Sequence, residues 1–231
     1  MDKQIYVIGD VHGCYNTLIA LVDKLPNKQN SKICFVGDLI DRGTNSKDVI
    51  KFIRDNNYDC VLGNHEFFMM ESLPKIIQDN NKILTEKWTS KKAGGKETIK
   101  SYNNEKEILD DLEFLKTLPL YKEYKNFTTS DGRYLVVSHS SVESKWKYKD
   151  YPKDSVEYEK FVNTVLYSRY KSFDNKDIFN VYGHTPISEV IINEFKAQVD
   201  LGCCFKSIEP TASLCALEFP SMNVIIQESI D

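Results

Sequence analysis

The sequence lacks several features that define whole classes of protein. No apolar run approaches the roughly 20 residues that a membrane-spanning helix requires, and no Cys-x-x-Cys pair occurs among the six cysteines. There is no dense basic block, and the net charge of −4 argues against electrostatic binding to nucleic acid. The Met1-Asp2-Lys3 start leads into a strand-like segment without a signal peptide. We therefore expect a cytoplasmic protein with reduced cysteines that binds neither nucleic acid nor membrane.

The chain is long enough to bury a substantial core within one domain, at 231 residues. No internal repeat, low-complexity tract or Pro/Gly/Ser-rich linker marks a boundary within it. We therefore expect a single domain over residues 1–231, and the sequence predicts no oligomeric state.

The first 66 residues alternate between β-branched runs and helical spacing. The apolar runs predict strands at Ile5–Ile8, Ile33–Val36 and Tyr58–Leu62. The helical spacing predicts helices at Cys14–Leu25 and Ser46–Asn57. Because the links are short, this order predicts right-handed crossovers and a parallel sheet.

The rest of the chain changes from helical to largely β. Residues 66–118 are predicted to be mostly helical, and we expect about 67–118 to form a helical flap or insertion within the domain. Turns are predicted at Pro210 and Pro220. The later elements are a strand at Arg133–Val137, a helix at Glu157–Tyr170, and strands at Ile178–Tyr182, Val190–Phe195, Ala197–Leu201, Ser213–Phe219 and Asn223–Gln227. The sequence therefore predicts a mixed α/β sandwich.

Polar clusters follow the strands. The first three strands lead into Gly9-Asp10-Val11-His12-Gly13, Gly37-Asp38-Leu39-Ile40-Asp41-Arg42-Gly43 and Gly63-Asn64-His65-Glu66. Two later strands end similarly, at Ser138-His139 and at Gly183-His184-Thr185-Pro186. Ligands of open α/β sheets bind beyond the carboxyl ends of the strands, so we expect these clusters to converge.

All the histidines of the chain fall in these clusters. A lone histidine at such a place is usually a hydrogen-bonded loop residue, but here the four are His12, His65, His139 and His184. Imidazole and oxygen ligands without thiolate fit Mn²⁺, Fe²⁺ or Zn²⁺ better than a structural zinc site. Together with the nearby aspartates and Asn64, the histidines supply more ligands than one tetrahedral ion needs. That number of ligands suits two ions about 3.5–4 Å apart.

The motifs GDVHG, GDLIDRG and GNHE resemble the phosphoprotein phosphatase branch of the calcineurin-like metallophosphoesterases. His139 and Gly183-His184-Thr185 fall in the family's order, and the similarity spans essentially the whole chain. Within the family the chain is most similar to small bacterial and phage serine/threonine phosphatases of the bacteriophage lambda type. Trp88, Gly94-Gly95 and Ser101-Tyr102 resemble a pattern of that branch. The resemblance implies an α/β sandwich of two mixed β-sheets flanked by helices.

The resemblance also implies a ligand set for two divalent ions. Mn²⁺ is favoured, with Fe and Zn as alternatives. One ion would be bound by Asp10 and His12, Asp38 would bridge the two, and the second would be bound by Asn64, His139 and His184.

The family's catalytic roles carry over to a further group of positions. Arg42 would hold the phosphate oxygens, together with Asn64 and His65. His65, oriented by Asp41, would also protonate the leaving group. Arg169 in Leu166-Tyr167-Ser168-Arg169 is the best match to a second phosphate-binding arginine, and the alternative is a solvated arginine at a helix end.

Phosphate ester hydrolysis explains these residue types chemically. The ester's negative oxygens must be neutralised before a nucleophile approaches, and two cations with a bidentate Arg42 would do so. Metal-bound water ionises near neutral pH and then attacks phosphorus in line. An imidazole such as His65 suits protonation of the leaving alkoxide near pH 7.

Other phosphatase chemistries lack their motifs in this sequence. No cysteine is followed six positions later by arginine, no Asp-x-Asp occurs, and no G-x-x-x-x-G-K-[ST] loop is present.

Two segments carry weaker signals. Asp200-Leu201-Gly202-Cys203 departs from the family's usual Asp-Thr-Gly, and Lys82–Lys100 is predicted to be a solvated helical flap, with a grip on phosphorylated substrates as the alternative.

The favoured hypothesis is a two-metal phosphatase that hydrolyses phosphoserine and phosphothreonine in proteins, with phosphotyrosine and small phosphate esters as further substrates. A metal-bridging hydroxide would attack directly. The main alternative is a dinucleoside polyphosphate hydrolase of the same fold. Symmetrical enzymes of that type generally lack the acidic residues equivalent to Asp41 and Glu66, so their presence favours the phosphatase. A catalytically dead phosphate-binding module should have lost a ligand or the acid, and none is missing.

Overall fold

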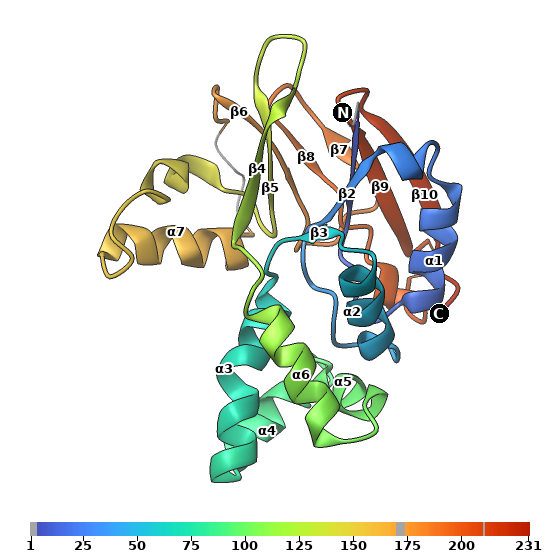
Figure 1. Cartoon of the computed structure of the whole chain (residues 1–231), viewed down its shortest axis with the longest axis vertical. Coiled ribbons are helices and arrows are strands. Elements are labelled where there is room, and N and C mark those ends of the chain that lie inside the picture. Colours follow the sequence, from blue (N-terminus) through green and yellow to red (C-terminus); the bar gives the residue numbers. More distant parts are fainter. Residues whose placement is uncertain (1–3, 170–173, 210) are drawn as a thin grey trace.

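The computed structural model describes residues 4–169, 174–209 and 211–231. Two five-stranded mixed β-sheets pack face to face in this part of the chain, with helices outside them (Figure 1). The first sheet has the order β10 (Asn223–Glu228), β9 (Ser213–Phe219), β1 (Ile5–Ile8), β2 (Lys32–Phe35) and β3 (Asp59–Cys60). The second has the order β4 (Tyr121–Thr128), β5 (Tyr134–Ser138), β6 (Ile178–Tyr182), β8 (Lys196–Gln198) and β7 (Ile191–Ile192). The predicted α/β sandwich of two mixed sheets is confirmed.

Side-chain alternation along β1 explains why the first sheet is buried on both faces. Ile5 and Val7 pack in the layer between the two sheets, where they join Val137 and other residues of the second sheet. Tyr6 and Ile8 point the other way, into the core beneath the helices. Strands covered on both sides read as continuous apolar runs, which is why β1 was recognisable in the sequence.

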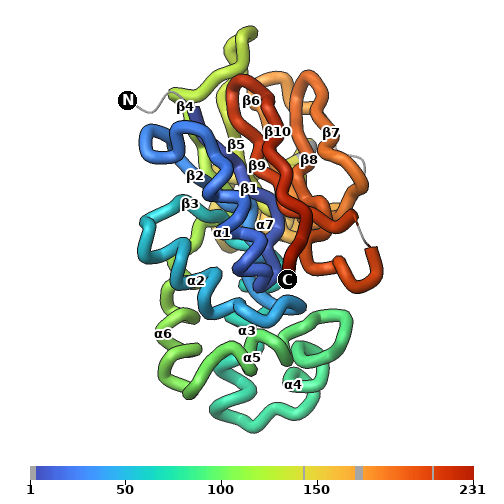
Figure 2. The backbone as a smooth tube through the Cα atoms, turned by 90° about the vertical axis from the view of Figure 1, so that its right-hand side faces the viewer, coloured from blue at the N-terminus to red at the C-terminus, as the bar shows by residue number. Residues whose placement is uncertain are grey.

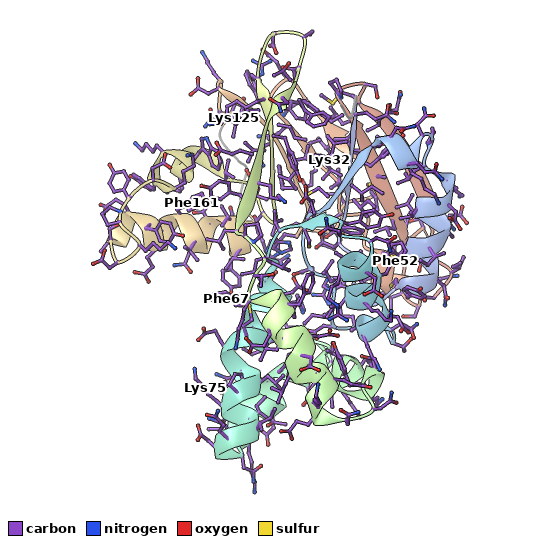
Figure 3. All side chains as sticks on the ribbon, viewed as in Figure 1. Lys32, Phe52, Phe67, Lys75, Lys125 and Phe161 are labelled. Carbon is purple, nitrogen blue, oxygen red and sulfur yellow. The ribbon has the colours of Figure 1, made fainter. Side chains whose placement is uncertain are left out.

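Helices cover the outer faces. The first sheet is covered by α1 (Tyr15–Lys24) and α2 (Ser46–Asp55), and β1–β2 and β2–β3 pair in parallel as predicted. The second sheet is covered by α7 (Val156–Tyr167), whose Phe161 packs on Ile178. Phe67 contacts the same cluster from below (Figure 3).

Helices also form a separate group at one end of the molecule, as Figures 1 and 2 show. They are α3 (Asn64–Asp79), α4 (Lys82–Trp88), α5 (Gly95–Ser101) and α6 (Glu105–Leu115), and short 3₁₀ turns lie elsewhere at Lys28–Asn30, Glu143–Tyr148 and Cys203–Phe205. The helical content predicted for residues 66–118 is therefore present. That this group is an insertion within one domain stays a prediction.

Other differences from the predicted elements are local. β4 was not predicted, because it is a half-exposed edge strand with charged residues and a register shift between Tyr124 and Thr128. The strands predicted at 190–195 and 197–201 shrink to two and three residues. The turn at Pro220 is present, whereas Pro210 and the predicted helix end at Tyr170 lie outside the described residues. In the described ranges no helix has the length and apolar content needed to span a bilayer.

Candidate functional site

The loops after the strands meet at one edge of the sandwich. His12, Asp38 and His184 adopt left-handed backbone conformations there, with φ of 47°, 49° and 72°. Such conformations cost about 1–3 kcal/mol each and persist only where the surroundings enforce them. The N–H groups of Val11 and His12 both donate to the carbonyl of Asp38, at 3.1 and 2.9 Å, which joins the first two loops.

Glu66 holds the second loop in place. Its buried carboxylate accepts hydrogen bonds from four backbone N–H groups, those of Gly63 (3.0 Å), Asp38 (2.8 Å), Leu39 (2.8 Å) and Ile40 (3.2 Å). A single carboxylate therefore satisfies donors that would otherwise be buried without partners. Sequence analysis used Glu66 only to distinguish branches of the family, and this positioning role appears only in three dimensions.

Asp38 lies at the centre of the site, almost fully buried. Its Oδ2 is 3.4 Å from Nε2 of His12, and its Oδ1 is 3.5 Å from Nε2 of His139. The backbone N–H of His65 donates to Oδ1 at 3.0 Å. Burial raises the pKa of Asp38. Attraction to His139, His65 and His12 when these rings carry a proton, together with the His65 backbone N–H, outweighs burial, so that pKa lies well below its ordinary value. Asp38 is therefore an anion between two histidine groups.

Two groups of potential metal ligands share Asp38. One contains Asp38, His12 and His65, and the other contains Asp38, His139 and His184, with all ligand atoms of each group within 4.8 Å of one another. A shared carboxylate between two sets of imidazoles is what a two-metal site requires. These clusters fit a binuclear metal centre.

The donor chemistry around His139 supports the same conclusion. Its Nδ1–H donates to the carbonyl of Val36 at 3.0 Å, so its Nε2 carries a lone pair. That nitrogen faces the Oδ1 atoms of Asn64 (2.9 Å) and Asp38 (3.5 Å), which are also acceptors. Nδ1 of His184 also lies 3.0 Å from this nitrogen. Imidazole nitrogens and side-chain oxygens therefore converge on one place, where their lone pairs can bind a cation. His12 is arranged alike, because its Nδ1–H donates to Ile40 at 2.8 Å and leaves Nε2 available.

The pKa shifts separate the histidines into two kinds. Burial lowers the pKa of His12 and His139, and burial together with His139 lowers the pKa of His184 to about 3. These three rings are therefore neutral, the form that binds a metal. Burial also lowers the pKa of His65, but Asp38 and a hydrogen bond to Asp41 outweigh it, and the net shift is upward. His65 is thus the histidine best suited to carry a proton.

Asp41 orients His65 within a buried hydrogen-bond network. Nδ1–H of His65 donates to Oδ2 of Asp41 at 2.6 Å. The same carboxylate accepts the Trp88 indole N–H at 3.2 Å and the Thr98 hydroxyl at 2.6 Å. Thr98 and the role of Trp88 were missed in the sequence. The only signal was the similarity of Trp88 to a family pattern, which does not say what its indole contacts.

Two glycines allow this network to assemble. Gly94 has φ of 88°, and a Cβ there would lie 2.5 Å from the backbone nitrogen of Arg42. A Cβ on Gly95 would lie 2.4 Å from the Trp88 indole. The turn between α4 and α5 therefore packs directly against the second loop, and the Arg42 N–H donates to the Gly94 carbonyl at 3.2 Å.

The remaining predicted residues lie at the edges of the metal clusters. The Asp10 carboxylate is buried and accepts the backbone N–H of His184 at 3.1 and 3.2 Å, and burial, Asp200 and Asp38 raise its pKa. It belongs to neither ligand group above, so its ligation of a metal stays a prediction. The Arg42 guanidinium contacts Nε2 of His65 at 3.0 Å and Nε2 of His12.

A cleft of about 890 Å³ opens beside these groups. Arg42, Arg169, His184 and Phe205 are among the residues that line it, and the Phe205 ring centroid lies 5.2 Å from the Arg42 guanidinium. Arg169 is exposed, follows the end of α7 at Tyr167, and is one of the residues that line the cleft. The arrangement brings both predicted phosphate-binding arginines to one cavity, while their roles stay predictions.

Comparison with known proteins agrees with the fold and the clusters. The calcineurin-like phosphoesterase family matches residues 3–205. The bis(5'-nucleosyl)-tetraphosphatase PrpE [asymmetrical] of Halalkalibacterium halodurans is 27% identical over 252 residues, covering 96% of this chain and 92% of its own.

Solved structures show the same fold at low sequence identity. The crystal structure of a candidate diadenosine tetraphosphatase has a TM-score of 0.65 and 18% identity, covering 98% of this chain and 93% of its own. A serine/threonine phosphatase of Saccharomyces cerevisiae has a TM-score of 0.59 and 17% identity, covering 100% of this chain and 81% of its own. With the family match over most of the chain and the paired ligand clusters, the chain belongs to the calcineurin-like phosphoesterase family and is a metal-dependent phosphoesterase.

Proposed function

We propose that the chain is a metal-dependent hydrolase of dinucleoside polyphosphates that cleaves them into unequal nucleotides. The observation that carries the proposal is the likeness to the asymmetrical tetraphosphatase of H. halodurans, which extends over 96% of this chain and 92% of that one. A cleft of about 890 Å³ beside Arg42 supports it, because this space exceeds what one phosphoryl group needs. The sequence alone favoured a protein phosphatase, and this likeness shifts the preference to the alternative.

Each part of the site has a role in this reaction. His12, Asp38, His139 and His184 would hold the ions, with Asn64 beside His139 and Asp10 as a further ligand. Mn²⁺ remains our first choice, because the donors are imidazole nitrogens and oxygens without thiolate. Bound ions would neutralise the phosphate oxygens. They would also lower the pKa of a water molecule, so that it ionises near neutral pH and can attack phosphorus.

Arg42 would exchange its present contacts for substrate. Its guanidinium now donates to Nε2 of His65 at 3.0 Å and contacts Nε2 of His12. Phosphate oxygens are stronger, bidentate acceptors, so a bound substrate would draw Arg42 away and release both nitrogens. Arg169, which lines the same cleft, would be a second contact to the phosphate.

Water would add to one phosphorus while a P–O–P bond breaks. The bridging oxygen leaves with the remaining phosphates, so diadenosine tetraphosphate and water give ATP and AMP. The leaving phosphate has a pKa near neutrality (about 6 for a phosphate monoester), so it departs easily as an anion. Proton donation by His65 then matters less than it would for a serine alkoxide.

A phosphoprotein phosphatase is the second candidate function. Asp41 and Glu66 are both present, and the 2.6 Å contact from Asp41 to His65 orients the ring and favours its protonated form. A proton donor of that kind suits an alkoxide leaving group.

One experiment separates the two functions. Mn²⁺-loaded protein is assayed on diadenosine tetraphosphate and on a panel of phosphoserine, phosphothreonine and phosphotyrosine peptides, with nucleotide products separated by ion exchange. The proposal expects the larger kcat/KM on the dinucleotide, with equal amounts of ATP and AMP. Two ADP per substrate would refute unequal cleavage. A kcat/KM that is tenfold or more higher on a phosphopeptide would replace the proposal with the phosphatase.

A further inference from the structure

One wall of the cleft beside Arg42 is basic. Lys91 and Lys92, from the turn between α4 and α5, and Lys96, from the first turn of α5, all line it and are exposed. The wall also contains one carboxylate, that of Glu97, which pairs with Lys100 at 2.8 Å.

The three lysines of this wall differ in their ion pairing from other lysines nearby. Among the residues that the structure describes, no carboxylate lies within ion-pair distance of Lys91, Lys92 or Lys96. Another lysine of the same helical group is paired, because Lys75 lies 3.7 Å from Glu71. Positive charges that converge in a concave site without counterions attract an anionic ligand.

The basic wall is fixed relative to the metal clusters. The Arg42 N–H donates to the Gly94 carbonyl at 3.2 Å, so the lysine-bearing turn is held against the backbone of Arg42. Trp88, at the end of α4, donates to Asp41, the neighbour of Arg42. The turn that bears the lysines therefore has a set position beside Arg42, the group that would receive the attacked phosphate.

We propose that this wall binds the phosphates of the substrate that lie beyond the one attacked. The inference rests on the proposed function and specifies it: a polyphosphate chain starts at Arg42 and runs along Lys91, Lys92 and Lys96. A phosphate monoester reaches Arg42 but not the wall. The wall is thus the specificity determinant that separates polyphosphates from monoesters.

The test compares two double variants of one basic segment. Lys91→Gln/Lys92→Gln removes two charges from the wall. The control, Lys82→Gln/Lys87→Gln, removes two exposed lysines of α4 that do not line the cleft. Each variant is assayed for hydrolysis of p-nitrophenyl phosphate, with tripolyphosphate or orthophosphate as competitor, at fixed free Mn²⁺ and several salt concentrations.

The wall variant should bind tripolyphosphate about tenfold more weakly, because two exposed charge pairs contribute roughly threefold each. Orthophosphate inhibition and the kcat/KM for p-nitrophenyl phosphate should stay within about twofold of wild type. The salt dependence of tripolyphosphate inhibition should become shallower, a change that a purely structural defect would not cause. The control variant should match wild type in all of these.

Two outcomes overturn the inference: equal weakening of tripolyphosphate and orthophosphate, or an effect of the control variant as large as that of the wall variant. The proposed function fails separately. If wild-type protein does not cleave diadenosine tetraphosphate, yet only the wall variant loses tripolyphosphate binding, the basic wall stands and the nucleotide substrate does not.

Discussion

Replacing His65 with asparagine should slow hydrolysis to a degree that depends on the leaving group. His65 donates from Nδ1 to Asp41 at 2.6 Å, and its pKa is raised because Asp38 and Asp41 outweigh burial. Once a bound phosphate draws Arg42 away from Nε2, the ring can carry a proton on that nitrogen and deliver it to the leaving group. General acid catalysis of this kind contributes about 10²–10⁴-fold for a poor leaving group, or roughly 3–5 kcal/mol of transition-state stabilisation.

The substrates differ in how much they need that proton. A serine alkoxide is a very strong base, so a phosphoserine peptide should lose the full 10²–10⁴-fold in the His65→Asn variant. A nucleotide phosphate has a pKa near neutrality (about 6 for a phosphate monoester), so diadenosine tetraphosphate should lose less than about tenfold. p-Nitrophenyl phosphate should fall between the two.

Single-turnover rates are the appropriate measurement, because product release would mask a change in chemistry. Metal content must be measured on the same samples, since His65 also belongs to one of the two ligand groups. Equal losses on all three substrates with unchanged metal content would refute proton donation, and would show that His65 positions phosphate or Arg42. Loss of an ion from the variant would make His65 a ligand instead.

Further predictions concern metal and structure. Asp38→Asn should bind fewer than two ions per chain and lose most activity, as metal analysis with kinetics would show; full metal content with near-normal rates would remove Asp38 from the bridging position. Saturating Mn²⁺ should raise the melting temperature, because free Mn²⁺ at 100 times its dissociation constant adds about 2.7 kcal/mol to the free energy of unfolding. Identical melting curves with and without Mn²⁺ would mean that the folded protein has no Mn²⁺ site. Gly95→Ala should displace the Trp88 indole, which should lower the free energy of unfolding in urea by about 1–3 kcal/mol and reduce kcat. An unchanged free energy of unfolding and kcat would show that the turn is not tightly packed. Asp231→Ala should lower the free energy of unfolding, measured with urea, by about 1 kcal/mol, because the Asp231 carboxylate accepts the Thr17 N–H at 2.9 Å and the Thr17 hydroxyl at 2.7 Å at the start of α1. An unchanged free energy of unfolding would mean that this cap is not formed in solution.

The metal clusters could be anticipated because strand ends and side-chain chemistry are both readable in sequence. The apolar runs of β1 and β2 mark strands that are buried on both faces, and the polar residues after them must lie at one sheet edge. His12 and Asp38 follow directly from that reasoning. Their left-handed backbone, by contrast, depends on hydrogen bonds between loops, which no local pattern records.

The supporting residues could not be anticipated, because their function depends on contacts between distant segments. Thr98 reaches Asp41 across 57 positions of the chain, and nothing around Thr98 marks it as part of a site. The lysine segment was readable as basic, but its placement on a wall of the cleft depends on how the α4–α5 turn packs on Arg42. Likewise β4 was missed because an edge strand need not be apolar.

The most direct test of the account measures cleavage of diadenosine tetraphosphate before and after metal is restored. Protein stripped of metal and verified by metal analysis should show no turnover, and addition of Mn²⁺ should restore it with ATP and AMP released in equal amounts. Undiminished turnover by the stripped protein would contradict the metal-dependent mechanism. Failure of Mn²⁺-loaded protein to cleave the dinucleotide, while it hydrolyses a phosphopeptide, would contradict the proposed substrate.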